Sequence, residues 1–387
     1  MPRLSLTEVP KENTITATFE IVTPMFLGDA EQKATAIRPT SIKGELRFWR
    51  RAMNGHLSLT ELAKEETRLF GSTDRGGVFS LSIEQANIKT KPLNLTDNRN
   101  PVDAAMLNIA KFSPQHYLLG QGLTERNAIT EGKFTIMILF TPKVEVSDRQ
   151  EIEQALQLFG NLGALGSRAR HGWGSVSLID VNGAKHIVIP KTVDDYKELL
   201  QTSLTGKTTS LPEFTAFSAK SRIDLVASSK DTITLLTRSA SELQLYRSFG
   251  NKGKVGSKDA ERNFTQDHDL LLEHIQGVKA TTAPNRVVFG LPHNYFFSDG
   301  KGKADVNAQV VDKETRRASP LFTHIQKIGA QYMLVHALLP AKFLPHNGKI
   351  VIKGGKGQTA QITPNVDYTV ITKFMDRFTG ATKVLPQ

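Results

Sequence analysis

Five basic side chains lie between positions 38 and 51, next to a predicted helix start. Apolar residues recur with helical spacing from Ile42 to Met53, which predicts an amphipathic helix over residues 41–54. Pro39, Thr40 and Ser41 are expected to supply the turn and a capping hydroxyl before it. The free backbone N–H groups and the dipole at a helix N-terminus attract anions. The pattern predicts a phosphate site, with the residues Arg38, Ser41, Lys43, Gly44, Arg47 and Arg50.

Gly44 is unusual so early in a helix, because glycine there costs about 1 kcal/mol relative to alanine. The simplest compensation is the close approach of another backbone. For the charges, the alternative is a surface helix with a solvated basic face, which a charge pattern alone does not exclude.

A second basic stretch, residues 160–174, contains five glycines. Glycine lets backbone N–H groups approach phosphate oxygens, while arginine neutralises charge and stacks on bases. The stretch is not a nucleotide-binding P-loop, because it lacks the GK[ST] ending and follows a predicted helix instead of a strand. Trp173 either stacks on a base or fills the core. The predicted contacts with a nucleic acid are Gly166, Arg168, Arg170, His171 and Trp173.

Composition limits the classes of function. The 387 residues include 49 Lys and Arg against 38 Asp and Glu, a net charge of +11 that favours a polyanionic partner. The absence of cysteine excludes disulfides, zinc ribbons, iron–sulfur clusters and thiol nucleophiles. No apolar run approaches the roughly 18 residues that span a bilayer, and the first residues lack a signal-peptide core. These features predict a soluble, cytoplasmic protein without membrane contact.

Catalysis is the less favoured interpretation. His171 has the most suggestive setting of the histidines, but its basic neighbours should lower its pKa and disfavour the charged acid form. His268 and His274 lie in a polar stretch and are predicted to be solvated. No HxH, HExxH or clustered carboxylate motif indicates a metal, so we predict no cofactor and no metal site.

The first half of the chain predicts strand, helix, strand, strand, helix and strand, which is the order of the ferredoxin-like fold. A polar, irregular insert over residues 85–132 is too long for an ordinary turn and predicts a functional loop or subdomain. The predicted elements are residues 14–22, 41–54, 77–84, 133–141, 148–162 and 173–179.

Several of these residues also carry a family resemblance. The segment PTSIKGELR (39–47) resembles the first-helix signature of the RAMP proteins of CRISPR effector complexes. Residues 162–176 are similar to the glycine-rich loop that this superfamily carries before its last strand. FGLPH (289–293) and RRASPL (316–321) resemble the type III-B branch. The resemblance spans about residues 14–345.

The resemblance implies a second, degenerate ferredoxin-like domain over residues 213–387, after a first domain over 1–195 and a polar connector at about 190–212. The expected fold is therefore α+β, with two ferredoxin-like (RRM-like) domains whose antiparallel sheets carry helices on one face. The elements predicted after the connector are strands at 221–227, 286–289, 321–327 and 332–339, a helix at 232–249 and a β-like segment at 350–372.

The resemblance further implies a non-catalytic subunit at the end of a multi-subunit filament. Its partners would be the distal (3′) part of a guide RNA, complementary target RNA and other RAMP subunits. Arg316 and Arg317 would contact RNA or a neighbouring subunit, although an ordinary strand entry before Pro320 explains them equally simply. Two alternatives stay open. One is a metal-independent endoribonuclease of the same superfamily that processes CRISPR RNA, and the other is a protein–protein scaffold.

Overall fold

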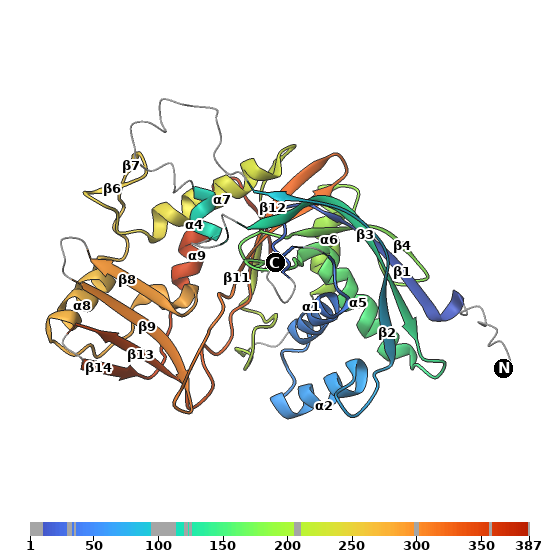
Figure 1. Ribbon diagram of the computed structural model, residues 1–387, viewed down its shortest axis with the longest axis horizontal. Coiled ribbons are helices and arrows are strands. Elements are labelled where there is room, and N and C mark those ends of the chain that lie inside the picture. Colours follow the sequence, from blue (N-terminus) through green and yellow to red (C-terminus); the bar gives the residue numbers. More distant parts are fainter. Residues whose placement is uncertain are drawn as a thin grey trace.

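Two β-sheets with the same strand order organise the chain (Figure 1). The computed structural model describes residues 11–28, 33–34, 36–93, 114–119, 123, 126–204, 210–297, 302–355 and 358–385. A short 3-10 helix, η1 (Lys11–Asn13), precedes the first sheet.

The first sheet is four-stranded and antiparallel, in the order β2-β3-β1-β4. Two helices pack against the same face of it (Figure 1), where their apolar stripes and the inward side chains of β1 form a common core. This arrangement confirms the predicted ferredoxin-like order. The elements are β1 (Thr14–Ile21), α1 (Pro39–Met53), β2 (Phe79–Pro92), β3 (Asn127–Phe140), α5 (Val146–Leu162) and β4 (Val176–Asn182).

The boundaries of the predicted insert were wrong at both ends. Residues 85–92 continue β2 and residues 127–132 belong to β3, so these two strands pair along an extended ribbon. A short helix, α4 (Pro114–Leu119), lies between them, and residues 94–113 fall outside the described residues. A further helix that the sequence analysis did not identify, α2 (Leu59–Phe70), follows α1 and starts with a capping box from Ser58 and Glu61.

The second sheet has the order β11-β12-β5-β15, which matches the first sheet position by position. Two ferredoxin-like units are therefore present, as predicted. The predicted strands at 221–227, 321–327 and 332–339 and the helix at 232–249 are confirmed. The elements are β5 (Arg222–Ser229), α7 (Thr232–Arg247), β11 (Leu321–Ile328), β12 (Gln331–Leu338), α9 (Thr369–Met375) and β15 (Thr382–Leu385).

Two insertions into the second unit form an accessory five-stranded sheet. The predicted strand at 286–289 is instead a 3-10 helix, and the predicted β-like segment at 350–372 ends in α9. The insertions contain β6 (Lys254–Val255), β7 (Lys258–Asp259), α8 (Thr265–Gln276), η2 (Asn285–Phe289), β8 (His293–Phe297), β9 (Gly302–Val310), β10 (Lys313–Thr315), β13 (Lys349–Gly354) and β14 (Gln358–Ile362).

The two units share one hydrophobic core, to which Trp49 of α1, Phe322 of β11 and Val335 of β12 all belong. Between β4 and β11, the Ser177 hydroxyl accepts a hydrogen bond from the Lys327 amide at 2.9 Å. The predicted connector at 190–212 contains α6 (Val193–Ser203), and the predicted end of the first domain at residue 195 falls inside this helix. The shared core holds α1, the glycine-rich loop and the entry to β11 in fixed positions.

Candidate nucleic-acid interface

The glycine-rich loop folds back on the end of β1, and its glycines are required for that path. Gly166 has φ +91°, and a Cβ atom there would lie 2.6 Å from the carbonyl oxygen of Phe26. Gly174 has φ +72°, and its Cβ would lie 2.0 Å from the carbonyl oxygen of Leu165. Because such distances exclude any side chain, packing within the chain already accounts for these two glycines.

Arg170 connects the loop to both ferredoxin-like units. Its guanidinium donates a hydrogen bond to the carbonyl of Ser319 and lies 4.5 Å from the ring centre of Phe322 and 5.5 Å from that of Phe48. Burial and the nearby charge of Arg317 lower the pKa of Arg170 to about 10, while Glu45 opposes this shift. The side chain thus braces α1, the loop and the entry to β11 against one another.

Arg168 and Arg316 form the exposed part of the same cluster. Arg168 has φ +63°, and its Nε donates to the carbonyl of Leu119 at 2.7 Å. Burial of part of the side chain and the charge of Arg316 lower the pKa of Arg168. Two like charges held this close favour a bound anion, since the anion relieves their repulsion.

Arg317 lies half-buried behind these exposed side chains. Its backbone pairs with Leu291 through hydrogen bonds of 2.8 and 3.0 Å, and its guanidinium lies 5.8 Å from the ring centre of Phe343. The segments FGLPH and RRASPL, which are separate in the sequence, therefore lie side by side in the fold.

The start of α1 borders the loop cluster. The Arg38 guanidinium donates to the carbonyl of Gly28 at 2.5 Å, one residue beyond the segment on which Gly166 packs. The helix begins at Pro39, and its N-terminus has no side-chain cap, so the predicted capping hydroxyl from residues 39–41 was wrong. Proline suits the first helical position, because its missing N–H is not needed there.

Gly44 is exposed, and no atom of the described residues lies within 4 Å of an added Cβ. Packing among the described residues therefore does not explain this glycine. The predicted close approach of another backbone would have to come from a bound partner.

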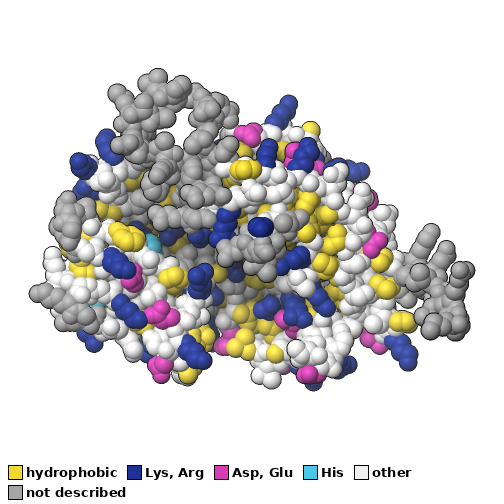
Figure 2. All heavy atoms as spheres, viewed as in Figure 1, with side chains coloured by type: hydrophobic (Ala, Val, Ile, Leu, Met, Phe, Trp, Pro, Cys, Tyr) yellow, Lys and Arg dark blue, Asp and Glu magenta, His cyan; other side chains and the backbone are white. Residues whose placement is uncertain are grey.

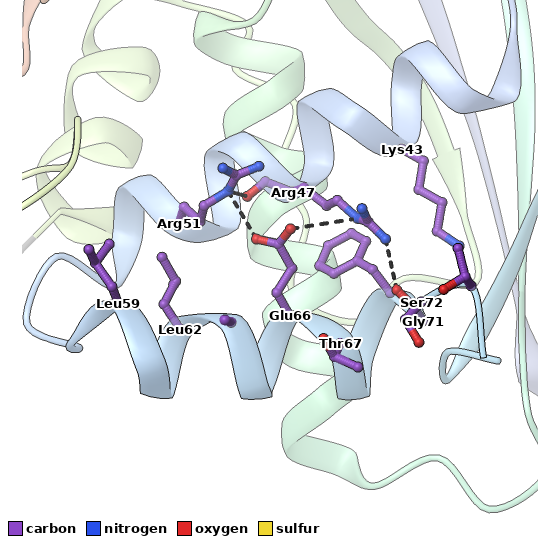
Figure 3. A pocket seen from close by; sticks show the side chains of 12 residues that line it. Lys43, Arg47, Arg51, Leu59, Leu62, Glu66, Thr67, Gly71 and Ser72 are labelled. Carbon is purple, nitrogen blue, oxygen red and sulfur yellow. Dashed lines mark hydrogen bonds and ion pairs between the residues drawn. The ribbon is translucent and has the colours of Figure 1, made fainter. Parts of the chain in front are cut away.

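Lys43 and Arg47 belong to a second basic surface, the groove between α1 and α2 (Figure 3). The Lys43 ammonium lies 5.2 Å from the ring centre of Phe79, and burial together with Arg47 lowers its pKa. Arg47 donates to the Gly71 carbonyl at 3.0 Å and approaches Glu66 at 3.9 Å. The groove has a volume of about 740 Å³.

Two predicted contact residues, Arg50 and Trp173, are instead part of the interior. Arg50 is 2% exposed and forms an ion pair of 2.8 Å with Glu151 on α5. Trp173 is fully buried, and its ring packs edge-on against Phe26 at 6.0 Å between centres. The predicted RNA contact was wrong for both residues, whereas the alternative that Trp173 fills the core is confirmed. For Arg50 the helical spacing gave the signal, because it follows Leu46 by four residues on the apolar face.

The histidines offer little acid–base chemistry. Burial, followed by the charges of Arg168 and Arg247, lowers the pKa of His171 to about 3, so the predicted direction is confirmed and the imidazole is neutral at pH 7. His274 is buried and accepts a hydrogen bond from the Ala280 amide, which contradicts the predicted solvation of this side chain. Within the described part of the chain, no group of three or more potential ligands could hold a metal ion.

Arg247 is a basic residue that the sequence analysis missed. Its guanidinium lies 4.7 Å from the ring centre of Phe289, and its charge acts on His171, which places it beside the loop cluster. Figure 2 shows Lys and Arg side chains along the middle of this face of the molecule.

None of the helices in the described ranges is long and apolar enough to cross a membrane.

Comparison with known proteins agrees with this arrangement. Residues 18–177 match the family model of the RAMP superfamily. These residues comprise most of the first ferredoxin-like unit, which therefore resembles a RAMP-superfamily domain. The chain is also 25% identical to the CRISPR system Cmr subunit Cmr1-2 of Pyrococcus furiosus over 171 residues, which cover 41% of this chain and 91% of that protein.

Solved structures extend the similarity of fold beyond residues 18–177. The crystal structure of Cmr1 from Pyrococcus furiosus aligns with a TM-score of 0.54 at 19% identity, covering 96% of this chain and 98% of that one. A chain in the cryo-EM structure of type III-B Cmr-beta bound to cognate target RNA aligns with a TM-score of 0.51 at 11% identity, covering 95% and 98%. At these identities the likeness shows the fold, which includes both ferredoxin-like units.

Proposed function

We propose that the chain is a non-catalytic RNA-binding subunit of a type III-B CRISPR effector complex, equivalent to its first-numbered subunit. It would act in the cytoplasm in antiviral defence, at the end of a filament of other RAMP subunits. Its ligand would be the distal (3′) part of the guide RNA, or the duplex of that part with target RNA. The similarity to Cmr1-2 and to the Cmr1 fold supports this assignment.

The observation that carries the proposal is the convergence of basic groups from three separate segments. Arg168 of the loop and Arg316 before β11 lie close enough to repel each other, and Arg170 braces the loop against Phe48 of α1. At the start of α1, Arg38 bonds to Gly28, next to the segment on which Gly166 packs. Exposed arginines bind phosphate irrespective of the base, which suits a guide whose sequence varies. Because burial and nearby arginines lower the pKa of His171 to about 3, its imidazole is a weak base and has no acidic proton to donate at pH 7, so we propose that bound RNA is not cut.

The α1–α2 groove supplies a second phosphate contact in this proposal. Replacing Lys43 and Arg47 together by alanine should weaken binding of every single-stranded RNA about tenfold, since each exposed ionic contact contributes up to roughly 1 kcal/mol. Fluorescence anisotropy with several unrelated RNA sequences measures the loss. The matched control is Lys143→Ala/Lys191→Ala, which removes the same charge from exposed positions elsewhere. A loss confined to particular RNA sequences would show that the groove does not act through phosphates.

A further inference from the structure

A small cavity opens between α1, the glycine-rich loop and β11. Its volume is about 130 Å³ and one side is open to solvent, so it can admit the edge of a planar base while the rest of the ring system stays outside. Half-buried side chains form its mouth and fully buried ones its floor. The residues that matter for its chemistry are Glu45, Phe48, Trp49, Arg170 and Phe322.

Flat groups surround the cavity. The ring of Phe48 lies 5.1 Å from that of Trp49 and 5.6 Å from that of Phe322, and the Arg170 guanidinium lies over both phenylalanines. Proteins that read single-stranded RNA hold unstacked bases against such aromatic rings and guanidinium planes. The shape therefore fits a planar heterocycle better than a flexible aliphatic group.

The polar groups of the cavity are one acceptor and two donors. Burial raises the pKa of Glu45 to about 7, and the charge of Arg170 favours its carboxylate form. The Trp49 indole N–H lies close enough to this carboxyl to lower its pKa, yet it is buried and makes no hydrogen bond of normal geometry. A ligand that donates to Glu45 and accepts from Arg170 would pair with both of these charged groups.

We propose that this cavity receives one guanine base of the bound RNA. The pairing edge of guanine carries two N–H donors for the Glu45 carboxylate, next to the O6 acceptor for Arg170. Adenine and cytosine present an unprotonated ring nitrogen to the carboxylate instead, and uracil offers a single N–H between two carbonyls. This inference rests on the proposed RNA-binding function, to which it adds a base preference at one position beside sequence-independent phosphate contacts.

The first test uses the wild-type chain and needs no substitution. A labelled uridine-rich single strand of guide length carries isolated guanosines, and in its partner strand each guanosine is replaced by inosine, which lacks only the N2 amino group. The guanosine strand should bind about tenfold tighter, because one well-placed pair of hydrogen bonds discriminates by that order. Equal affinity for the two strands overturns the cavity assignment.

The second test uses Glu45→Gln, with Glu198→Gln as the charge-matched control on an exposed face of α6. Glu45→Gln should abolish the preference for guanosine and leave the affinity for the inosine strand within about twofold, while the control keeps the tenfold preference. A preference that survives in Glu45→Gln overturns the role of the carboxylate.

Two further outcomes distinguish a failure of the guanine site from a failure of the proposed RNA-binding function. If GMP competes with the guanosine strand at the concentration of guanosine in that strand, the ligand is a free nucleotide and the assignment to RNA is wrong. If neither strand binds at any salt concentration, the proposed RNA-binding function fails, whereas equal binding of both strands removes only the guanine site.

Discussion

Replacing Trp173 by alanine should lower the free energy of unfolding by about 3–5 kcal/mol, because the substitution empties a fully buried site in the core. The indole packs against Phe26 and belongs to the same apolar cluster as Leu236 of α7. Its loss would therefore loosen both the loop and the second ferredoxin-like unit. Urea unfolding followed by circular dichroism measures the change.

The RNA affinity of the Trp173 variants distinguishes a core residue from a stacking residue. Trp173→Phe should keep an aromatic ring in the core, fold more stably than Trp173→Ala and bind RNA as the wild type does. A Trp173→Ala protein of wild-type stability that nevertheless loses RNA affinity would contradict the buried role of this side chain.

The double substitution Arg168→Ala/Arg316→Ala should weaken RNA binding by about 10- to 100-fold, since it removes two charge-assisted phosphate contacts. The slope of log affinity against log salt should become shallower by about 1.4, at roughly 0.7 for each phosphate on a single strand. Arg170 is a poorer choice, because its guanidinium also braces Ser319, Phe48 and Phe322. Filter binding over a series of salt concentrations measures both quantities.

Lys143→Ala/Lys191→Ala again provides the control with equal loss of charge. Its slope should equal that of the wild type within the error of the titration. If the control loses as much affinity as Arg168→Ala/Arg316→Ala, the effect is one of net charge and the loop cluster is not a specific site.

The α1 helix shows what the sequence could predict and where the prediction ended. The spacing of Ile42, Leu46 and Trp49 defined the helix and its buried face. The prediction then placed Arg50 on the RNA-binding surface because of its charge. Its position next to the apolar stripe instead directs its side chain toward Glu151. The direction in which Lys43 points depends on α2, and α2 itself was not predicted.

The glycine-rich loop was recognised from its composition, but the reason for its glycines was not. Positive φ values and backbone collisions at Gly166 and Gly174 involve Phe26 and Leu165, which only the tertiary structure places beside them. The grouping of Arg247 with Arg168 depends on the same packing. Residue type alone therefore predicted Arg168, Arg170 and Arg316 as members of the cluster, but not Arg247.

The strands of the second unit were predicted where apolar and polar residues alternate regularly, as in β11 and β12. The accessory sheet was not predicted, because its paired strands β9 and β13 are separated in the sequence by β10 and by the β11–β12 hairpin of the second ferredoxin-like unit. The short apolar run of η2 is compatible with either a strand or a helical turn, and periodicity does not separate the two at this length.

A salt titration of the wild-type chain with a labelled single-stranded RNA of guide length tests the central claim most directly. We predict a log–log slope of about −3 to −4, which corresponds to about 5 phosphate contacts on a single strand. The RNA should remain intact on a denaturing gel, with or without EDTA. Discrete cleavage would identify a nuclease, and an absence of binding would mean that the basic surfaces serve protein partners; either result contradicts the proposed function.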